Sequence, residues 1–189
     1  MAELPPRRKV RDVELLSALA HPLRAALLRY LMAVGPRTAS ECADAVGSTA
    51  SNCSWHLRQL AKFGLVEATG GGDGRQRPWQ ATVVGLDLGE FDDDPATRAA
   101  QLAVFGTSLG EEQKLTQRFF ERIDELDPGW RRAGIFNGYT LALNAAELTE
   151  LADKIDDLVR PYASTIREDP PPDARPVYAG FRAFVRLER

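Results

Sequence analysis

A run of hydrogen-bonding side chains between residues 48 and 59 is the feature of this chain best suited to chemistry. The polar and aromatic residues there are Ser48, Thr49, Ser51, Asn52, Ser54, Trp55, His56, Arg58 and Gln59. Asparagine and glutamine pair with adenine, serine and threonine bond to several base acceptors or to phosphates, and arginine binds phosphate. The pattern predicts a helix whose surface contacts a DNA groove, because a core helix has little use for so many polar groups.

The expected role of each side chain depends on its place in this helix. The first two turns of a recognition helix reach base edges, so the hydroxyls and amides up to Trp55 are candidates for base contacts. Trp55 itself either packs between the helix and the following hairpin or covers a base or sugar. His56 contacts a phosphate or packs near the turn, and Arg58 meets a phosphate. The helical period turns only Cys53, Leu57 and Leu60 toward the core.

Three helices are predicted upstream of this segment. Leucines at helical spacing predict helices over 12–20 and about 23–33. Thr38 and Glu41 form a T-x-x-E capping box that opens a third helix. Gly47 ends that helix, because glycine adopts the left-handed conformation common after helix C-termini.

The segment itself is expected to form a fourth helix, capped by Ser48 and covering residues 48–63. Beyond it the pattern changes to extended structure, with strands over 65–69 and 75–84 around a glycine-rich turn. Two helices, a helix-turn-helix and a hairpin are the order of a winged helix-turn-helix domain, which we place at residues 13–84.

Basic residues outside the fourth helix extend the predicted DNA surface. Arg75 and Arg77 lie at the hairpin turn, where arginines enter a minor groove or hold phosphates unless the turn is simply solvated. Residues 1–12 contain a basic cluster. A contact between this cluster and DNA stays open, and the expected state is a disordered solubilising arm.

Charge is unevenly distributed along the 189 residues. The net charge of −3 by itself argues against nucleic acid as a partner. However, residues 1–84 hold 11 Lys and Arg against 7 Asp and Glu, whereas residues 85–189 hold 13 against 20. A basic half beside an acidic half is expected when one half meets phosphates.

The second half is expected to hold two copies of the chain together. Residues 85–94 are predicted to be an acidic linker, and Asp94 followed by proline begins a long helix over 95–126 or two shorter ones. This helix and the first one would form the interface of a homodimer. Residues 95–189 are therefore predicted to be a dimerisation segment with a small C-terminal unit.

That C-terminal unit is predicted to have a β-α-β arrangement. Residues 138–143 form a strand, Asn144 and Glu147 cap a helix, and residues 175–187 form a second extended segment. Aromatic residues are frequent in and around this unit. They either enclose a small-molecule effector or fill a core and a subunit interface. The fold class is thus mainly α with small β.

Composition argues against several other classes of protein. No run of eighteen apolar residues occurs, so no membrane span is predicted. The two cysteines, Cys42 and Cys53, favour a reduced cytoplasmic compartment and are expected to be buried thiols rather than metal ligands. Neither a phosphate-binding loop nor a supported catalytic arrangement is found, so we expect neither an enzyme nor a cofactor.

A resemblance to a known family rests on two stretches in the first half of the chain. Residues 54–66 follow the pattern S-x-H-L-x-x-L-x-x-x-G-L-V, which resembles the end of the recognition helix in ArsR-type winged-helix transcription regulators. Residues 18–31 also resemble the second-helix motif of that family. The metal-sensing cysteines of the family lie at the start of the third helix, where this chain has Thr38 and Ser40. The resemblance therefore implies a regulator that does not sense metal.

The remainder is similar to the C-terminal extension of a group of actinobacterial regulators in this family, in which Trp79 and an aromatic residue at position 55 are common. This resemblance implies a repressor that acts as a dimer on double-stranded DNA. We therefore expect a homodimeric regulator of a pseudo-palindromic operator. The alternatives are the same scaffold gated by a small molecule in the C-terminal unit, and a winged-helix adaptor that binds protein instead of DNA.

Overall fold

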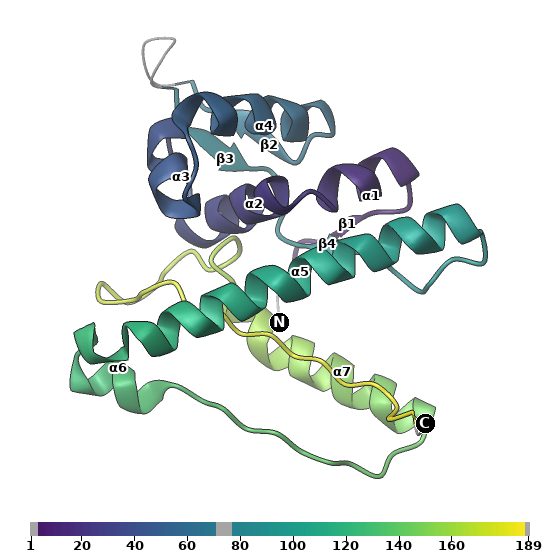
Figure 1. Cartoon of the computed structure of the whole chain (residues 1–189). Helices are drawn as coiled ribbons and strands as arrows, with labels where there is room; N and C mark the ends of the chain where they lie inside the picture. The colour runs from purple at the N-terminus through teal and green to yellow at the C-terminus, as the bar shows by residue number, and fades with distance from the viewer. Residues whose placement is uncertain (1–3, 71–76, 188–189) are drawn as a thin grey trace.

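The computed structural model describes residues 4–70 and 77–187 and shows a mainly helical chain with a few short strands (Figure 1). Its helices are α1 (Val13–Leu19), α2 (Pro22–Val34), α3 (Ala39–Val46), α4 (Ala50–Lys62), α5 (Pro95–Glu121), α6 (Pro128–Ala133) and α7 (Ala145–Val159), with 3-10 turns at Ile123–Glu125 and Arg160–Tyr162. Its strands are β1 (Arg8–Lys9), β2 (Val66–Ala68), β3 (Trp79–Ala81) and β4 (Leu86–Asp87). The predicted class, mainly α with small β, is confirmed.

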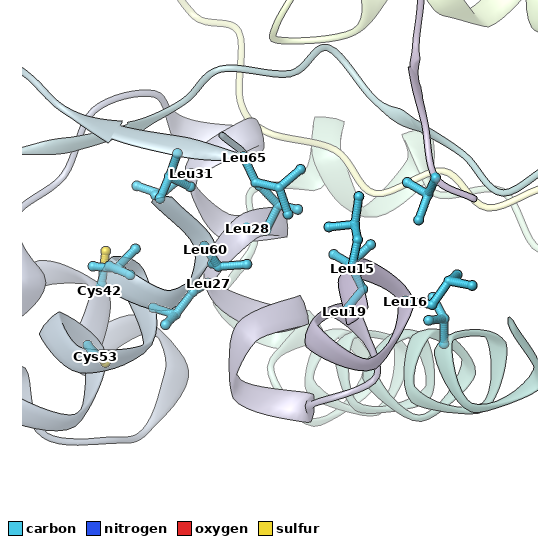
Figure 2. Packing of buried hydrophobic residues seen from close by; sticks show 14 of the residues in the cluster. Leu15, Leu16, Leu19, Leu27, Leu28, Leu31, Cys42, Cys53, Leu60 and Leu65 are labelled. Carbon is cyan, nitrogen blue, oxygen red and sulfur yellow. The ribbon is translucent and has the colours of Figure 1, made fainter. Parts of the chain in front are cut away.

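The core of the molecule lies among the first four helices and the strand that follows them. Its fully buried members include Leu16, Leu27, Leu31, Cys42, Cys53, Leu57, Leu60 and Leu65. Figure 2 shows Leu27, Leu28 and Leu31 of α2 near Leu60 of α4, with the leucines of α1 farther along the same cluster. Burying one such side chain contributes roughly 1.5–3 kcal/mol, so this cluster fixes how α3 and α4 are presented.

Helix caps define the turn before α4. The capping box of Thr38 and Glu41 is present, and Gly47 ends α3 with a φ of +67°. The expected cap Ser48 is wrong by one residue: the Thr49 hydroxyl accepts the Asn52 backbone N–H at 3.2 Å. Thr49 takes this role because its backbone is extended, with φ −107° and ψ 150°, and the helical conformation begins at the next residue, Ala50.

The hairpin after α4 is shorter than expected. β2 and β3 pair antiparallel, with Val66 opposite Ala81, and β3 is extended by a bridge between Arg37 and Trp79. The hydrogen bond from the Trp79 N–H to the Arg37 carbonyl measures 2.7 Å. The predicted strands over 65–69 and 75–84 are thus reduced to three residues each. Arg75 lies outside the described residues.

The N-terminal segment differs from the disordered arm that its composition predicted. Arg8 and Lys9 form β1, which pairs in parallel with β4, and Val10 is completely buried. The Arg11 guanidinium donates to the Asp87 carbonyl at 2.8 Å. An apolar residue between basic ones provides the anchor, because burying Val10 compensates for ordering a short strand.

Helix α5 is one continuous helix that crosses beneath the first four (Figure 1). Asp94 caps it, as expected, and Pro95 occupies its first turn. Buried Gln101 donates to the Leu88 and Glu90 carbonyls at 3.1 and 2.9 Å, so the predicted acidic linker is tied to the helix. The helix ends at Glu121 rather than at residue 126.

The C-terminal unit is not β-α-β in the described part of the chain. Helix α7 forms with the predicted capping box of Asn144 and Glu147. Residues 138–143 and 175–187 are extended but have no strand partner. A strand needs a neighbour for its backbone hydrogen bonds, and neither segment is paired with a strand in the described part of the chain. The predicted strands were therefore wrong for this chain by itself.

Candidate nucleic-acid interface

The outer face of α4 is polar, basic and open to solvent. Ser51, Asn52, Trp55, Arg58 and Lys62 are all exposed, and the helical period places them along one side. The opposite side carries the buried Cys53, Leu57 and Leu60, as the sequence predicted. No residue of α4 is acidic. The exposed face therefore offers donors and positive charge, which DNA phosphates and base edges accept.

Short side-chain hydrogen bonds organise this face. The Asn52 amide donates to the Ser48 hydroxyl at 3.1 Å, and Arg58 donates to the Ser54 hydroxyl at 2.7 Å. Lys62 donates to the Gln59 amide oxygen at 3.1 Å. Each pair is exposed, so DNA can replace the partner without leaving a buried group unsatisfied.

His56 is placed differently from the other predicted DNA contacts. Its side chain is only 5% exposed, and its ring centroid lies 4.5 Å from that of His21. Burial lowers the pKa of His56, and the nearby His21 and Arg24 lower it further. The helical period did not place His56 on the core side, so the sequence allowed two roles for it, a phosphate contact or packing near the turn. The burial supports the structural alternative.

His21 links this ring to the start of α2. Its Nδ1 accepts the Leu23 backbone N–H at 3.2 Å, so the imidazole acts as the cap of α2. Burial and Arg24 lower the pKa of His21. Protonation of Nδ1 would remove the lone pair that accepts this bond. The lowered pKa values of His21 and His56 thus favour the neutral form of both imidazoles.

Trp55 projects from the interface beside His56. It is 49% exposed, and its ring meets the His56 ring edge-on at a centroid distance of 4.7 Å. The sequence left two roles open for Trp55, which are packing against the hairpin and covering a base or sugar. The exposed half of its side chain is available for the second role.

Gln59 and the hairpin arginines lie at the edges of the face. Gln59 is half-buried beside Val13 and Glu14 of α1, in a shallow depression. Arg77 is exposed next to β3. Ser48 is half-buried and Thr49 is exposed. Most predicted contacts thus lie on one helix and its flanks, and among those that the structure describes His56 alone is buried.

Lys62 is a candidate contact that the sequence argument missed. It is exposed in the last turn of α4, one turn after Arg58. Its spacing of four residues from Arg58 was the available signal.

The cysteines are buried and separate from the interface. Both Cys42 and Cys53 are fully buried and free of disulfides. Burial raises the pKa of Cys42 to about 11, with a smaller contribution from Cys53. Within residues 4–70 and 77–187, no three His, Cys, Asp or Glu side chains gather as metal ligands. In the same ranges, the helices are too short or too polar to cross a membrane.

A large cavity lies on the opposite side of the helix-turn-helix. It has a volume of about 1160 Å³ and is bounded by α2, the end of α3, α5 and residues 156–179. Its walls come from segments that are distant in the chain, so no sequence pattern predicts it.

One comparison with known proteins identifies the helix-turn-helix in the first half of the chain. Residues 19–68 match the family of helix-turn-helix domains. This segment covers α2, α3, α4 and β2 and is the kind of domain with which transcription regulators bind DNA. A search of curated protein sequences gave no match.

Among solved structures, the chain is similar to the crystal structure of a MarR family transcription regulator. The two sequences are 18% identical, and the alignment covers 83% of this chain and 82% of that chain with a TM-score of 0.32. We base no conclusion on a structural likeness this low. The domain match alone supports a DNA-binding transcription regulator.

Proposed function

We propose that this protein is a sequence-specific DNA-binding transcription regulator of the cytoplasm, acting as a homodimeric repressor of the ArsR type without metal sensing. The observation that carries the proposal is the acid-free, exposed face of α4 within the helix-turn-helix domain. The bound dimer would repress by occupying a promoter.

Two copies of α4 would enter successive major grooves of a pseudo-palindromic operator. Such half-sites lie about 34–36 Å apart, one helical turn of DNA. Asn52 lies in the first turn of α4, the part of a recognition helix that contacts bases, and the exposed Arg58 and Arg77 would meet phosphates. Arg75 belongs to the same proposal by its position in the sequence.

The dimer interface would be formed by α5 together with α1. Leu102, Phe105 and Leu109 form an exposed apolar stripe on α5, and Phe91 packs on Phe105 at a ring distance of 5.5 Å. Val13 of α1 is also exposed. This stripe lies on a different side of α5 from buried Thr97, Gln101 and Val104, so the chain's own core leaves it free. Large exposed apolar patches of this kind mark interfaces.

Selection of bound duplexes from a random pool, followed by competition gel shifts, tests the proposal. Asn52→Ala should cost about 1–3 kcal/mol of discrimination at one base position. Asn137→Ala is the matched control, since it removes an exposed amide from the C-terminal half. Failure of the wild-type chain to bind any duplex, or full discrimination by the Asn52 variant, contradicts the corresponding part of the proposal.

Salt dependence gives a second, independent measurement. Arg58→Gln should weaken binding to all sequences equally and reduce the slope of log affinity against log salt by about 1. Arg132→Gln serves as the control, because Arg132 is exposed on α6, away from the interface. A winged-helix adaptor that binds protein would show no such salt-dependent affinity for duplex DNA.

The large cavity favours the ligand-gated form of the same function. It lies between the helix-turn-helix and the C-terminal segments, where an effector could influence both. Regulation by a small molecule is therefore the second candidate function.

A further inference from the structure

We propose that the cavity between α2, α5 and residues 156–179 binds an amphipathic organic anion with a flat apolar body, such as an aromatic carboxylate or sulfonate. The effect of this ligand on DNA binding rests on the function proposed above. Binding of the ligand itself does not.

The walls of the cavity fit an apolar, flat body. Helix α2 contributes Leu23, Ala26 and Tyr30, which are half-buried and only partly covered by the rest of the chain. Three further aromatic rings line the cavity: Trp130, Tyr162 and Tyr178. Sites for small molecules combine such apolar and aromatic walls with a few polar groups that orient the ligand.

The charges of the lining favour an anion. Seven Arg or Lys side chains line the cavity against three Asp or Glu. Most of these cations have a carboxylate partner: Arg7 and Arg160 pair with Asp156, Lys114 with Glu111, Arg29 with Glu112 and Arg175 with Asp127.

Two arginines of the lining remain for a ligand. Among the residues that the structure describes, Arg118 and Arg167 form no ion pair with a carboxylate. Arg167 lies over the Tyr162 ring at 5.2 Å, which holds its guanidinium against the cavity wall. An arginine binds a carboxylate or sulfonate through two parallel hydrogen bonds, so either guanidinium could hold the charged end of the ligand.

The cavity reaches the turn that positions the DNA-binding helix. Its lining includes Ala45, Val46, Gly47 and Ser48, the end of α3 and the turn before α4. Ser48 accepts a hydrogen bond from Asn52, the residue placed to contact bases. A ligand that contacts this turn therefore acts one hydrogen bond away from the interface.

The C-terminal segment connects the cavity to the rest of the fold. Arg29 of α2 lies 5.6 Å from the Tyr178 ring centroid, and Thr165 donates to the Val84 carbonyl at 3.2 Å. Occupancy of the cavity would change how this segment packs on α2. If the ligand binds the DNA-free arrangement more tightly, DNA affinity falls by the same factor, with typical couplings of about 5–150-fold.

Two fluorescent probes of nearly the same shape test the binding site without DNA. 1-Anilinonaphthalene-8-sulfonate carries an anionic group, and N-phenyl-1-naphthylamine does not. The full chain should bind one anionic probe per cavity. The double variant Arg118→Gln/Arg167→Gln should raise the Kd of the anionic probe at least about tenfold, the loss of one charged contact, and leave that of the neutral probe within twofold.

Two further variants show whether the probes occupy this cavity. Arg132→Gln removes an arginine outside the lining and should change neither Kd. Ala26→Trp fills the cavity from α2 and should weaken both probes, with circular dichroism confirming that the helices are retained. Equal effects of the Arg118/Arg167 and Arg132 variants, or unchanged one-to-one binding by a folded Ala26→Trp variant, overturn the site.

Adding the anionic probe to the complex with a selected duplex tests the regulatory part. A decrease in DNA affinity that is lost in the Arg118/Arg167 double variant supports it. Probe binding with no effect on DNA affinity overturns the regulation and leaves the site standing. A chain that binds the probe but no duplex overturns the proposed function alone.

Discussion

Apolar side chains are mostly buried in residues 13–81 and mostly exposed in residues 135–187. In the first region Leu27, Leu57 and Leu65 are completely buried in a shared core. In the second, Ile135, Phe184 and Leu187 are 78%, 80% and 85% exposed. Both regions contain apolar side chains, but only in the first are these side chains covered by other parts of the described chain.

The difference shows which part of the molecule is complete by itself. The helix-turn-helix buries its apolar side chains in one core, to which Val10 and Val104 of α5 also belong, and exposes a polar face of α4. The second region has two extended segments without strand partners and an α7 with no buried residue. Exposed apolar surface of this extent favours burial by a second molecule.

The largest expected effect comes from truncating one leucine in each region. Leu57→Ala should lower the free energy of unfolding by about 2–5 kcal/mol, because it leaves a cavity among buried neighbours. Leu141→Ala, at an exposed position, should change it by less than about 0.5 kcal/mol in a monomer. Urea titrations followed by circular dichroism measure both.

Equal losses for the two variants would contradict this comparison. If the Leu141 variant loses stability only at high protein concentration, a second copy covers that residue. Leu141 would then be exposed in the monomer and covered in the dimer.

The next effect concerns the apolar stripe of α5. The double variant Leu102→Glu/Leu109→Glu should weaken self-association by at least about tenfold, because it would bury two unpaired charges in the proposed interface. Light scattering after size-exclusion chromatography reports the mass. A matched change on the opposite side of α5, Lys114→Glu/Arg118→Glu, should leave the dimer intact. The same mass for both variants would place the interface elsewhere.

A smaller effect should come from the two capping boxes. Thr38→Ala should cost about 1 kcal/mol of global stability, because α3 is part of the core. Asn144→Ala removes the same kind of cap from α7, which packs on few residues. It should increase hydrogen exchange in α7 and leave the unfolding of the first region unchanged. A global loss from Asn144→Ala would show that the regions unfold together.

The smallest effect is a dependence of stability on pH that belongs to the first region. Burial lowers the pKa of His21 and of His56 below their usual value of 6.5. The unfolded chain then binds more protons than the folded chain, so stability falls as the pH drops below about 6.5. His21→Asn/His56→Gln should flatten this part of the curve, because asparagine keeps the cap of α2.

Carboxylates supply an internal control for this pH experiment. Hydrogen bonds from the helix N-termini lower the pKa of Glu41 and Asp94 below 4.5 and 3.8. Their contribution is present at higher pH and is lost only in that more acidic range. The histidine variants should leave it unchanged. A loss of slope at both pH ranges would point to general destabilisation.

Local signals made the first region predictable. The capping box at Thr38, the glycine at position 47 and the leucine spacing each depend on neighbours within a few residues. The same locality explains the small errors, since Ser48 and Thr49 are both good caps and only backbone geometry selects between them. The inward orientation of His56 places its ring beside His21, the cap of α2, which spacing along α4 cannot show.

The sequence by itself determined the helix-turn-helix, its caps and the polar face of α4, because these follow from periodicity and short-range hydrogen bonds. Only the tertiary structure decided that residues 8–9 pair with β4, that residues 138–143 lack a strand partner, and that Arg118 and Arg167 line one cavity. Each of these depends on segments far apart in the chain, whose approach is set by packing and not by local pattern.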